Sequence, residues 1–355
     1  MKRLVIGVAV VFAIAAGCTA ITPVPVNGKG HHPRPIPTPT VRPTPTVRPT
    51  LTVRPTPTAT ASPSSSPSPS SSPSPRPTTT TETWWKPTSV NPVQFHWVLG
   101  DALNVTVPIQ MGLRDFSGNP LPAPNVIDID GESNTAATVA SLHAQGKKVI
   151  CYIDAGVYET YRLDAHKFPA GIWGNADLGW NGSFWLDIRR IADLAPIIQA
   201  RMQMCKDKGF DAIEPDEIDG WENNTGFPLT YQDQLRYNRA LAQWAHNIGM
   251  SIGQKGDLIQ AHDLVTSFDW TLNEECYQYK ECTSVYDPVT DSNVAGLQVY
   301  TAANKMVLVV EYKLTSTQWT AACADSRTRH FNMSLLKLGL PNNGGRQPCS
   351  TAAKW

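Results

Sequence analysis

The chain has 355 residues, with 30 Lys or Arg, 30 Asp or Glu and a formal net charge of zero. Eight of the basic residues and one of the acids lie before residue 84, so the remainder carries a formal charge of −7. This excess of acid argues against a nucleic acid as partner. It is compatible with a cationic partner or with an ordinary solvated acidic surface.

Residues 1–20 are typical of a secretory signal, because a basic start precedes an unbroken apolar run over residues 4–16. That run is too short for a stable membrane span. It ends in Ala-Ala-Gly-Cys at Cys18, which resembles the lipobox of bacterial lipoproteins, where the cysteine is lipidated. The sequence therefore predicts a lipid anchor at Cys18 and a location at the cell surface. The alternative is an ordinary cleaved signal in which Cys18 is lost.

Residues 21–83 consist almost entirely of Pro, Thr, Ser, Val and Arg, with a near-repeat of Pro-Thr-Val-Arg. Because such a segment has too few apolar groups to offset its chain entropy, the sequence predicts a disordered linker that proline keeps extended. All eleven tryptophans lie beyond residue 83. The folded domain is therefore predicted to span residues 84–355.

Beyond residue 125, strand-like runs alternate with helix-like segments. Eight such alternations within the length of one barrel predict a (β/α)8 TIM-type barrel. An open, doubly wound sheet is disfavoured, because Asp-Gly-Glu at 130–132 is not the glycine-rich phosphate turn that would follow its first strand. The predicted strands are residues 126–130, 148–154, 184–188, 211–216, 251–255, 269–274, 306–311 and 331–336, and the clearest helices are residues 134–145, 191–208 and 231–247.

Two stretches fall outside this alternation. Residues 84–124 precede the first predicted strand and are expected to form a leader with one or two extra strands. Residues 168–183 are rich in Gly and Trp and are expected to form an insertion over the mouth of the barrel.

Six cysteines lie in the predicted barrel domain, an even number that favours disulfides in an exported protein. No spacing of Cys and His resembles a zinc site, and neither a metal nor a cofactor is expected. The natural local pairs are Cys276 with Cys282 and Cys323 with Cys349, whereas Cys151 and Cys205 form either a third pair or two buried thiols.

Acidic residues stand at the end of nearly every predicted strand. The carboxyl ends of barrel strands open onto one face, where the active sites of this fold are built. Carboxylates gathered there repel one another, so their presence favours a functional site. Capping of the following helix is the structural alternative and accounts for one or two of them. The seven acids are Asp130, Asp154, Asp187, Asp216, Asp257, Glu274 and Glu311.

Side-chain alternation selects two of these acids as a pair. Glu214 and Asp216 share the face of the fourth strand that points toward the barrel axis, and Glu274 has the same orientation on the sixth. Cleavage of a glycosidic bond needs two carboxyl groups, one as proton donor and one as nucleophile or base. Asp216 and Glu274 can supply this catalytic pair, whereas Glu275 is expected to point away from the axis.

Five motifs follow one another in a characteristic order and spacing. They are Trp-Trp-Lys-Pro at 84–87, Gly-Lys-Lys-Val-Ile-Cys-Tyr at 146–152, Trp-Leu-Asp-Ile-Arg at 185–189, the acidic run at 214–221, and Asn-Glu-Glu-Cys-Tyr-Gln-Tyr at 273–279 with Cys282. From about residue 84 to the C-terminus the chain resembles glycoside hydrolase family 114, the endo-α-1,4-polygalactosaminidase family of (β/α)8 barrels. The resemblance implies Asp216 as nucleophile and Glu274 as acid/base, with pocket residues Asp130, Tyr152, Glu159 and Lys255.

Three positions depart from the family pattern. At 153–156 the usual Phe-Ser-Ala-Gly is Ile-Asp-Ala-Gly, so Asp154 adds an acid to the mouth. At 215–217 the usual Pro-Asp-Asn is Pro-Asp-Glu, and at 255–257 the usual Lys-Asn-Asp is Lys-Gly-Asp. Because the catalytic pair is retained, these departures bear on substrate contacts more than on the class of reaction.

The partner that the resemblance implies is an amino-sugar polysaccharide, whose free amines an acidic mouth would hold by charge-assisted hydrogen bonds. Asp154 and Glu214 are expected among the substrate-binding residues for this reason. Lys255 is either an ion-pair partner of the acids or a donor to the substrate. Trp180, Trp221 and Tyr279 are either stacking platforms for sugar rings or core residues, and Trp221 is expected to bind substrate.

The sequence thus predicts a monomeric, endo-acting hydrolase that contacts the membrane only through its lipid anchor. Two other functions remain open: a barrel that only binds polysaccharide, and a barrel hydrolase of another kind, such as an α-galactosidase-like enzyme or a metal-dependent deacetylase. Retention of Asp216 and Glu274 argues against the first, and the lack of a His-rich mouth argues against the metal enzyme. Retaining or inverting chemistry is not decided by the residues, and the resemblance favours retaining.

Overall fold

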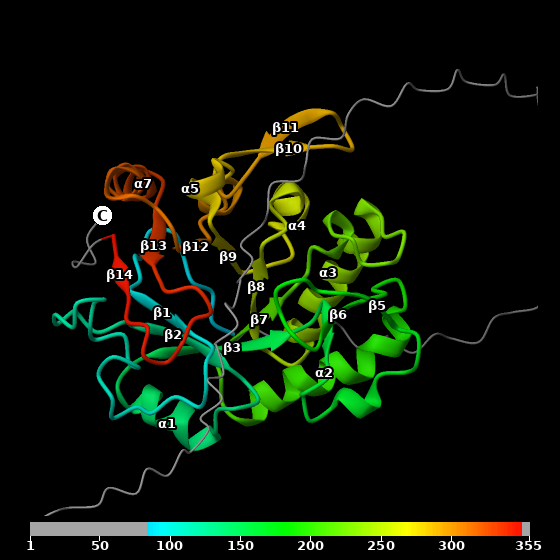
Figure 1. The fold of residues 1–355 in the computed structure, drawn as a ribbon, viewed down its shortest axis with the longest axis horizontal. Coiled ribbons are helices and arrows are strands. Elements are labelled where there is room, and N and C mark those ends of the chain that lie inside the picture. Colours follow the sequence, from blue (N-terminus) through cyan, green and yellow to red (C-terminus); the bar gives the residue numbers. More distant parts are fainter. Residues whose placement is uncertain (1–83, 350–355) are drawn as a thin grey trace, which may run out of the picture.

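The computed structural model describes residues 84–349 (Figure 1). The predicted signal with Cys18, the predicted linker and residues 350–355 lie outside this range. Residues 84–349 form a TIM-type (β/α)8 barrel, in which a curled, largely parallel sheet carries helices on its outer side (Figure 1).

Eight strands of the main sheet run parallel, and seven of them match predicted strands. They pair in the order β1-β2-β3-β7-β8-β9-β12-β13, and β14 adds a short antiparallel edge to β13. Their bounds are β1 Phe95–Val98, β2 Val126–Asp130, β3 Lys148–Asp154, β7 Ala212–Asp216, β8 Ser251–Lys255, β9 Trp270–Glu274, β12 Met306–Glu311, β13 Phe331–Leu335 and β14 Gln347–Pro348.

The prediction that residues 184–188 form a barrel strand is wrong. The corresponding strand, β6 (Ser183–Leu186), pairs antiparallel with β4 (Val157–Glu159) and β5 (Trp173–Ala176) in a separate three-stranded sheet. The eighth barrel strand is instead β1, from the segment predicted as a leader with one or two extra strands. Both runs are short and apolar, and periodicity does not say which sheet such a run joins.

The first and last parallel strands of the sheet lie side by side. The N–H of Val93, just before β1, donates to Oδ1 of Asn332 on β13 over 2.8 Å. At the other end of β1, the N–H of Leu99 donates to the carbonyl of Leu340 over 3.1 Å. These contacts hold β1 against β13 and bring the two ends of the curled sheet together.

The interior of the barrel is filled by the inward-facing side chains of the strands. Ala212 on β7 and Leu272 on β9 belong to this inner apolar cluster, as the alternation predicts. Trp270, also on β9, is fully buried there. A Cβ on Gly253 of β8 would lie 2.5 Å from the Trp270 ring, so the glycine leaves the space that this indole fills. The acids that follow Ala212 and Leu272 at intervals of two therefore face the axis above an apolar floor.

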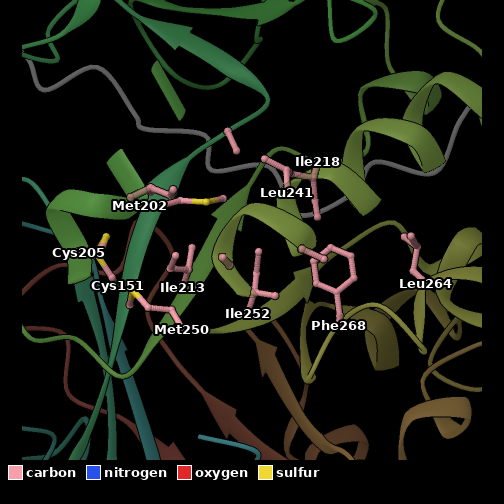
Figure 2. Close-up of a cluster of buried hydrophobic side chains, with 14 of the residues drawn as sticks. Cys151, Met202, Cys205, Ile213, Ile218, Leu241, Met250, Ile252, Leu264 and Phe268 are labelled. Atoms are coloured by element: carbon pink, nitrogen blue, oxygen red, sulfur yellow. A yellow bond between two sulfur atoms is a disulfide. The ribbon is translucent and has the colours of Figure 1, made fainter. Parts of the chain in front are cut away.

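The outer faces of the strands pack against the helices in a second, larger core. This cluster contains Ile213 on β7 and Ile252 on β8, together with Met202 of α2 (Ile191–Asp207) and Leu241 of α3 (Tyr231–Asn247) (Figure 2). Helix α3 begins with a capping box, in which the Thr230 hydroxyl accepts the N–H of Asp233 and the Asp233 carboxylate accepts the N–H of Thr230. The other helices are α1 Ala136–Ala144, α4 Ala261–Leu264, α5 Cys276–Tyr279, α6 Gln298–Ala302 and α7 Ser316–Thr328.

Two additions stand on loops at the carboxyl ends of the strands. The three-stranded sheet of β4, β5 and β6 lies between β3 and α2 in the chain and agrees with the predicted insertion after residue 168, although it begins earlier. The hairpin of β10 (Ser284–Asp287) and β11 (Ser292–Ala295) follows β9 and projects from the barrel (Figure 1). Both therefore border the face on which the strands end.

Three disulfides join the six cysteines of the described domain. Both predicted bridges, Cys276–Cys282 and Cys323–Cys349, are present. Cys151 on β3 and Cys205 on α2 form the third, which the sequence left open. This last pair lies in the core of Figure 2 and ties a barrel strand to its covering helix.

Candidate active site

A single lysine joins the two acids that the sequence selected as a pair. Lys255, at the end of β8, donates from Nζ to Oδ1 of Asp216 over 2.8 Å and to Oε2 of Glu274 over 2.8 Å. The two acceptor oxygens are therefore at most twice 2.8 Å, or 5.6 Å, apart. The carboxylate side chains of Asp216 and Glu274 are 15% and 16% exposed, so both can be reached from the mouth of the barrel.

Each of these carboxylates also accepts a hydrogen bond from a tyrosine. The hydroxyl of Tyr152 on β3 donates to Oδ2 of Asp216 over 2.9 Å. The hydroxyl of Tyr312, the residue after β12, donates to Oε1 of Glu274. Sequence reasoning missed Tyr312, although alternation along β12 would have found it, since it shares the inward face of Leu308 and Val310.

Charge pairing decides the ionisation states of Lys255 and Asp216. Burial by itself lowers the pKa of Lys255, but the negative charges of Asp216, Glu274 and Glu214 raise it well above its usual value, so Lys255 stays protonated. Burial raises the pKa of Asp216, but the attraction and hydrogen bond of Lys255, with the Glu217 N–H and the Tyr152 hydroxyl, bring it below its usual value. Asp216 is thus an ionised carboxylate at neutral pH.

The backbone of the β3 end is fastened to the end of β7. The N–H groups of Ala155 and Gly156 both donate to the carbonyl of Asp216 over 3.1 Å. A Cβ on Gly156 would lie 1.6 Å from the carbonyl oxygen of Glu217, so only glycine allows this approach. Glu217 itself has φ 56°, a left-handed conformation that non-glycine residues seldom adopt. The position of Asp216 is therefore set by close backbone packing from both strands.

An arginine neutralises the acids on the β2 side of the mouth. Arg162 donates from Nη1 to Oδ2 of Asp130 over 2.5 Å and from Nε to Oε2 of Glu159 over 2.6 Å. The Tyr161 hydroxyl also donates to Glu159. The predicted pocket residues Asp130 and Glu159 are thus brought together, but by a cation that sequence reasoning did not identify. No motif marks Arg162, which lies on the loop between β4 and the next helical turn.

Burial favours the protonated form of two further acids beside Asp216. Burial, with the nearby charges of Glu159 and Asp216, raises the pKa of Asp154 well above its usual value. Burial and the charge of Asp216 do the same for the pKa of Glu217. Asp154 and Glu217 occupy positions where the chain departs from the family pattern, and the Asp154 carboxylate also accepts the N–H of Val157 over 2.9 Å. The mouth is therefore less negative than its number of acids suggests.

Comparison with known families shows to which family the chain belongs. The sequence profile of glycoside hydrolase family GH114 matches residues 74–354. The chain belongs to glycoside hydrolase family 114. Its structure is similar to that of Ega3 from Aspergillus fumigatus, solved in complex with galactosamine, with a TM-score of 0.60, 31% sequence identity and coverage of 73% of this chain and 96% of that one.

The glycoside hydrolase domain of PelA from Pseudomonas aeruginosa also aligns, with 13% identity, a TM-score of 0.47 and coverage of 71% of this chain and 98% of that one. The comparison with curated proteins gave no match. Membership of family 114 makes this chain a glycoside hydrolase, and the resemblance stated on the motifs is confirmed.

In this glycoside hydrolase, three of the seven strand-end acids have structural partners away from the catalytic pair. Glu311 accepts the N–H groups of Tyr277 and Gln278 and so caps α5. Asp187 pairs with Arg189 just after β6, and Asp257 accepts from Trp221 and Asn238. The structural explanation by capping and local pairing thus covers more of these acids than the sequence suggested.

Two predicted substrate-binding residues are placed differently by the structure. Glu214 is fully buried, with 0% exposure, so a substrate in the mouth does not reach it. Trp221 is half-buried, donates from its indole nitrogen to Asp257 over 3.1 Å and packs edge-on against Tyr231, so its ring is held in place by protein contacts. Trp180, on the loop between β5 and β6, is 40% exposed and remains a candidate platform, and Tyr279 is half-buried.

Residues 84–349 contain neither a metal cluster nor a membrane-spanning helix. No group of three or more His, Cys, Asp or Glu within this range is arranged to hold a metal ion. Nor does any helix in the same range combine the length and apolar character needed to cross a membrane.

Proposed function

We propose that this chain is an endo-acting hydrolase of α-1,4-linked, galactosamine-containing polysaccharide, with Asp216 as nucleophile and Glu274 as acid/base. The observation that carries the proposal is the Lys255 bridge, which limits the two carboxylate oxygens to 5.6 Å. Retaining glycosidases keep their carboxyl groups about 5–5.5 Å apart, whereas inverting enzymes leave about 6.5–9.5 Å for a water. A pair of carboxylates bridged by one ammonium group is compatible with the shorter separation, and the resemblance to family 114 favours retention.

In the proposed first step, a carboxylate oxygen of Asp216 attacks the anomeric carbon while the glycosidic C–O bond breaks. Glu274 enters this step in its protonated form and gives that proton to the departing oxygen, and a covalent glycosyl–Asp216 ester forms. In the second step Glu274 takes a proton from water, whose oxygen displaces Asp216 and releases the sugar. The cycle needs two carboxyl groups and water, and it uses neither a metal nor a cofactor.

The proposed substrate class rests on similarity and on charge. Ega3, with 31% identity, was solved with galactosamine. An amino sugar with a free amine is a cation, and burial raises the pKa of Asp154 and of Glu217 in the protein without substrate. A substrate ammonium group near Asp216 would favour ionisation of both acids and would donate charge-assisted hydrogen bonds to the carboxylates.

The test uses purified protein and partly de-acetylated galactosaminogalactan, with product lengths read by mass spectrometry. Products of many intermediate lengths are expected from endo cleavage. Asp216→Asn and Glu274→Gln should each lower turnover by at least about a thousandfold, because each removes the acid chemistry and keeps the shape. Glu275→Gln is the matched control, because Glu275 is the neighbouring acid and has no part in the proposed cycle.

The outcome also separates the competing functions. Binding of the polymer without any sugar release by the unaltered chain would favour a non-catalytic barrel. Release of sugar from another glycan, but not from galactosaminogalactan, would favour a different substrate. An α-configured first product, detected by NMR at early times, is the result expected for retention of an α-linkage, and a β-configured product would show inversion.

The location of the enzyme is proposed from the sequence before residue 84. We infer export and a lipid anchor at Cys18, with the extended linker holding a monomeric barrel away from the membrane. Cys18→Ala should release the protein from the membrane fraction into the medium. Unchanged membrane association of Cys18→Ala would contradict the anchor.

A further inference from the structure

Two carboxyl groups meet inside the barrel, one layer deeper than the catalytic pair. Asp128 precedes Asp130 by two residues on β2, and Glu214 precedes Asp216 by two residues on β7. Both point inward, and their exposures are 1% and 0%. The proposed reaction uses neither of them, since no substrate reaches this depth.

Too few hydrogen-bond donors surround Asp128 and Glu214 to stabilise both carboxyl groups in their ionised form. Among residues 84–349, neither oxygen of Asp128 has an N–H or O–H donor, and Oε1 of Glu214 has none. Oε2 of Glu214 accepts the indole N–H of Trp97 over 2.9 Å. The remaining neighbour of each carboxyl is the other, and the interaction between the two side chains shifts the pKa of both. Two carboxylates have only acceptors, so a hydrogen bond between them requires a proton.

We propose that Asp128 and Glu214 share a single proton, and that this singly charged pair positions Lys255 from the barrel interior. The first half stands on the burial of both carboxyl groups and on their lack, within the part of the chain that the structure describes, of hydrogen-bond donors other than the Trp97 indole. The second half rests on the proposed function, because it takes the carboxylates that Lys255 bridges as the catalytic pair.

The charges around the pair agree with one shared proton. Burial raises the pKa of Asp128 to about 8, and burial with the neighbouring charge of Asp128 raises the pKa of Glu214 well above its usual value. The charged groups that face the pair are Lys255 from β8 and Asp216 from β7. From β1, the neutral indole of Trp97 donates to Glu214 and lies 5.2 Å from Nζ of Lys255.

The geometry gives this pair a positioning role. On the inner side, Lys255 is attracted by the negative charge of the pair and by the ring of Trp97. On the outer side, it binds the two catalytic carboxylates. A second ionisation of the pair would draw the ammonium group inward and away from Asp216 and Glu274. Retention of the shared proton therefore keeps the lysine between the two carboxylates.

Amide substitutions test the proton directly. Asp128→Asn and Glu214→Gln each replace the shared proton by a fixed N–H of similar position, and the new side-chain amide of Glu214→Gln keeps an oxygen for Trp97. In the wild type, the folded pair holds a proton that the unfolded chain loses at about pH 4. The contribution of the pair to the free energy of unfolding therefore falls as pH rises from about 4 to about 8. The amide variants do not have this loss. Their Tm relative to wild type should therefore rise between about pH 5 and pH 8, by on the order of 5 °C.

A matched control is Asp164→Asn. Asp164 is ion-paired with Arg201, and the hydrogen bond and charge of that arginine outweigh burial to bring the pKa of Asp164 below its usual value. Its Tm difference from wild type should be constant between about pH 5 and pH 8, since Asp164 is ionised throughout. A constant difference for Asp128→Asn and Glu214→Gln as well would overturn the shared proton. If one amide variant fails to fold, the other variant still tests the shared proton. The wild type gives a second test, because a shared proton predicts the infrared carbonyl band of a protonated acid at pH 7.

Activity tests the positioning role separately. The ratio of kcat at about pH 9 to kcat at about pH 7 should be roughly threefold or more higher in Asp128→Asn than in wild type, because the variant cannot take a second charge. An unchanged ratio, with the expected Tm behaviour, would keep the shared proton and overturn the positioning role. Absence of hydrolysis in the wild type would count against the proposed function. The Tm and infrared results would still decide whether Asp128 and Glu214 share a proton.

Discussion

The hydroxyl of Tyr312, which follows β12, hydrogen-bonds to Oε1 of Glu274, at the end of β9. Burial and the negative charge of Glu274 raise the pKa of Tyr312 well above its usual value, so the phenol stays a donor. Since β9 and β12 are neighbours in the sheet, this contact fixes the side chain of Glu274 on the side opposite Lys255.

Tyr312→Phe should lower kcat about tenfold and leave KM nearly unchanged, because the proposed acid/base loses one of the two donors that orient it. Steady-state kinetics on the polymer measures the effect. Tyr286→Phe is the control, since Tyr286 also donates to a carboxylate, Asp291, but on the exposed hairpin. Equal losses in both variants would show that the Tyr312 hydroxyl has no special role.

Lys255→Met should move the acid limb of the pH–activity profile to higher pH. Burial already raises the pKa of Asp216, and Lys255 is the main group that brings it down. Without the ammonium, Asp216 takes a proton at a higher pH and is a nucleophile only above it. The profile of kcat/KM from about pH 4 to about pH 9 measures the shift. Lys255→Arg keeps the charge and should keep the acid limb, so a shift in Lys255→Arg but not in Lys255→Met would contradict the explanation.

The disulfides should differ in their contribution to stability. Cys151–Cys205 closes 54 residues and Cys276–Cys282 closes only 6. Loop-closure entropy then predicts a loss of about 4 kcal/mol for removal of the first bridge and about 2 kcal/mol for the second. Denaturant unfolding of the two double Cys→Ala variants measures both values. A larger loss from the short loop would show that local packing after Glu274, and not chain entropy, dominates.

The domain boundary predicts that a chain beginning at Trp84 folds and hydrolyses the polymer as well as the mature protein. Trp84 stacks on His246 at 4.5 Å and donates to Asp269 over 3.1 Å, and Trp85 packs against the inner barrel cluster. A chain beginning at Pro87 lacks both indoles and should have a Tm lower by several degrees. Equal Tm values for the two chains would place the boundary after Trp85.

Much of the fold follows from local patterns. The alternation of apolar and polar residues placed Glu214, Asp216 and Glu274 on the inner face, because the period of two along a strand is a local property. The same rule, extended one residue past β12, covers Tyr312. Spacing predicted the two local disulfides, since cysteines close in sequence meet at low entropic cost.

The sequence by itself determined the barrel class, the family and the acids that end strands β7 and β9. Only the tertiary structure decided that β1 and not β6 completes the barrel, because strand pairing is a long-range interaction. It also decided which acids have cations or donors: Arg162 reaches Asp130 across 32 residues, and Lys255 reaches Asp216 across 39. Charge and burial act through space, so the ionisation of each carboxyl depends on neighbours that the chain supplies from distant positions.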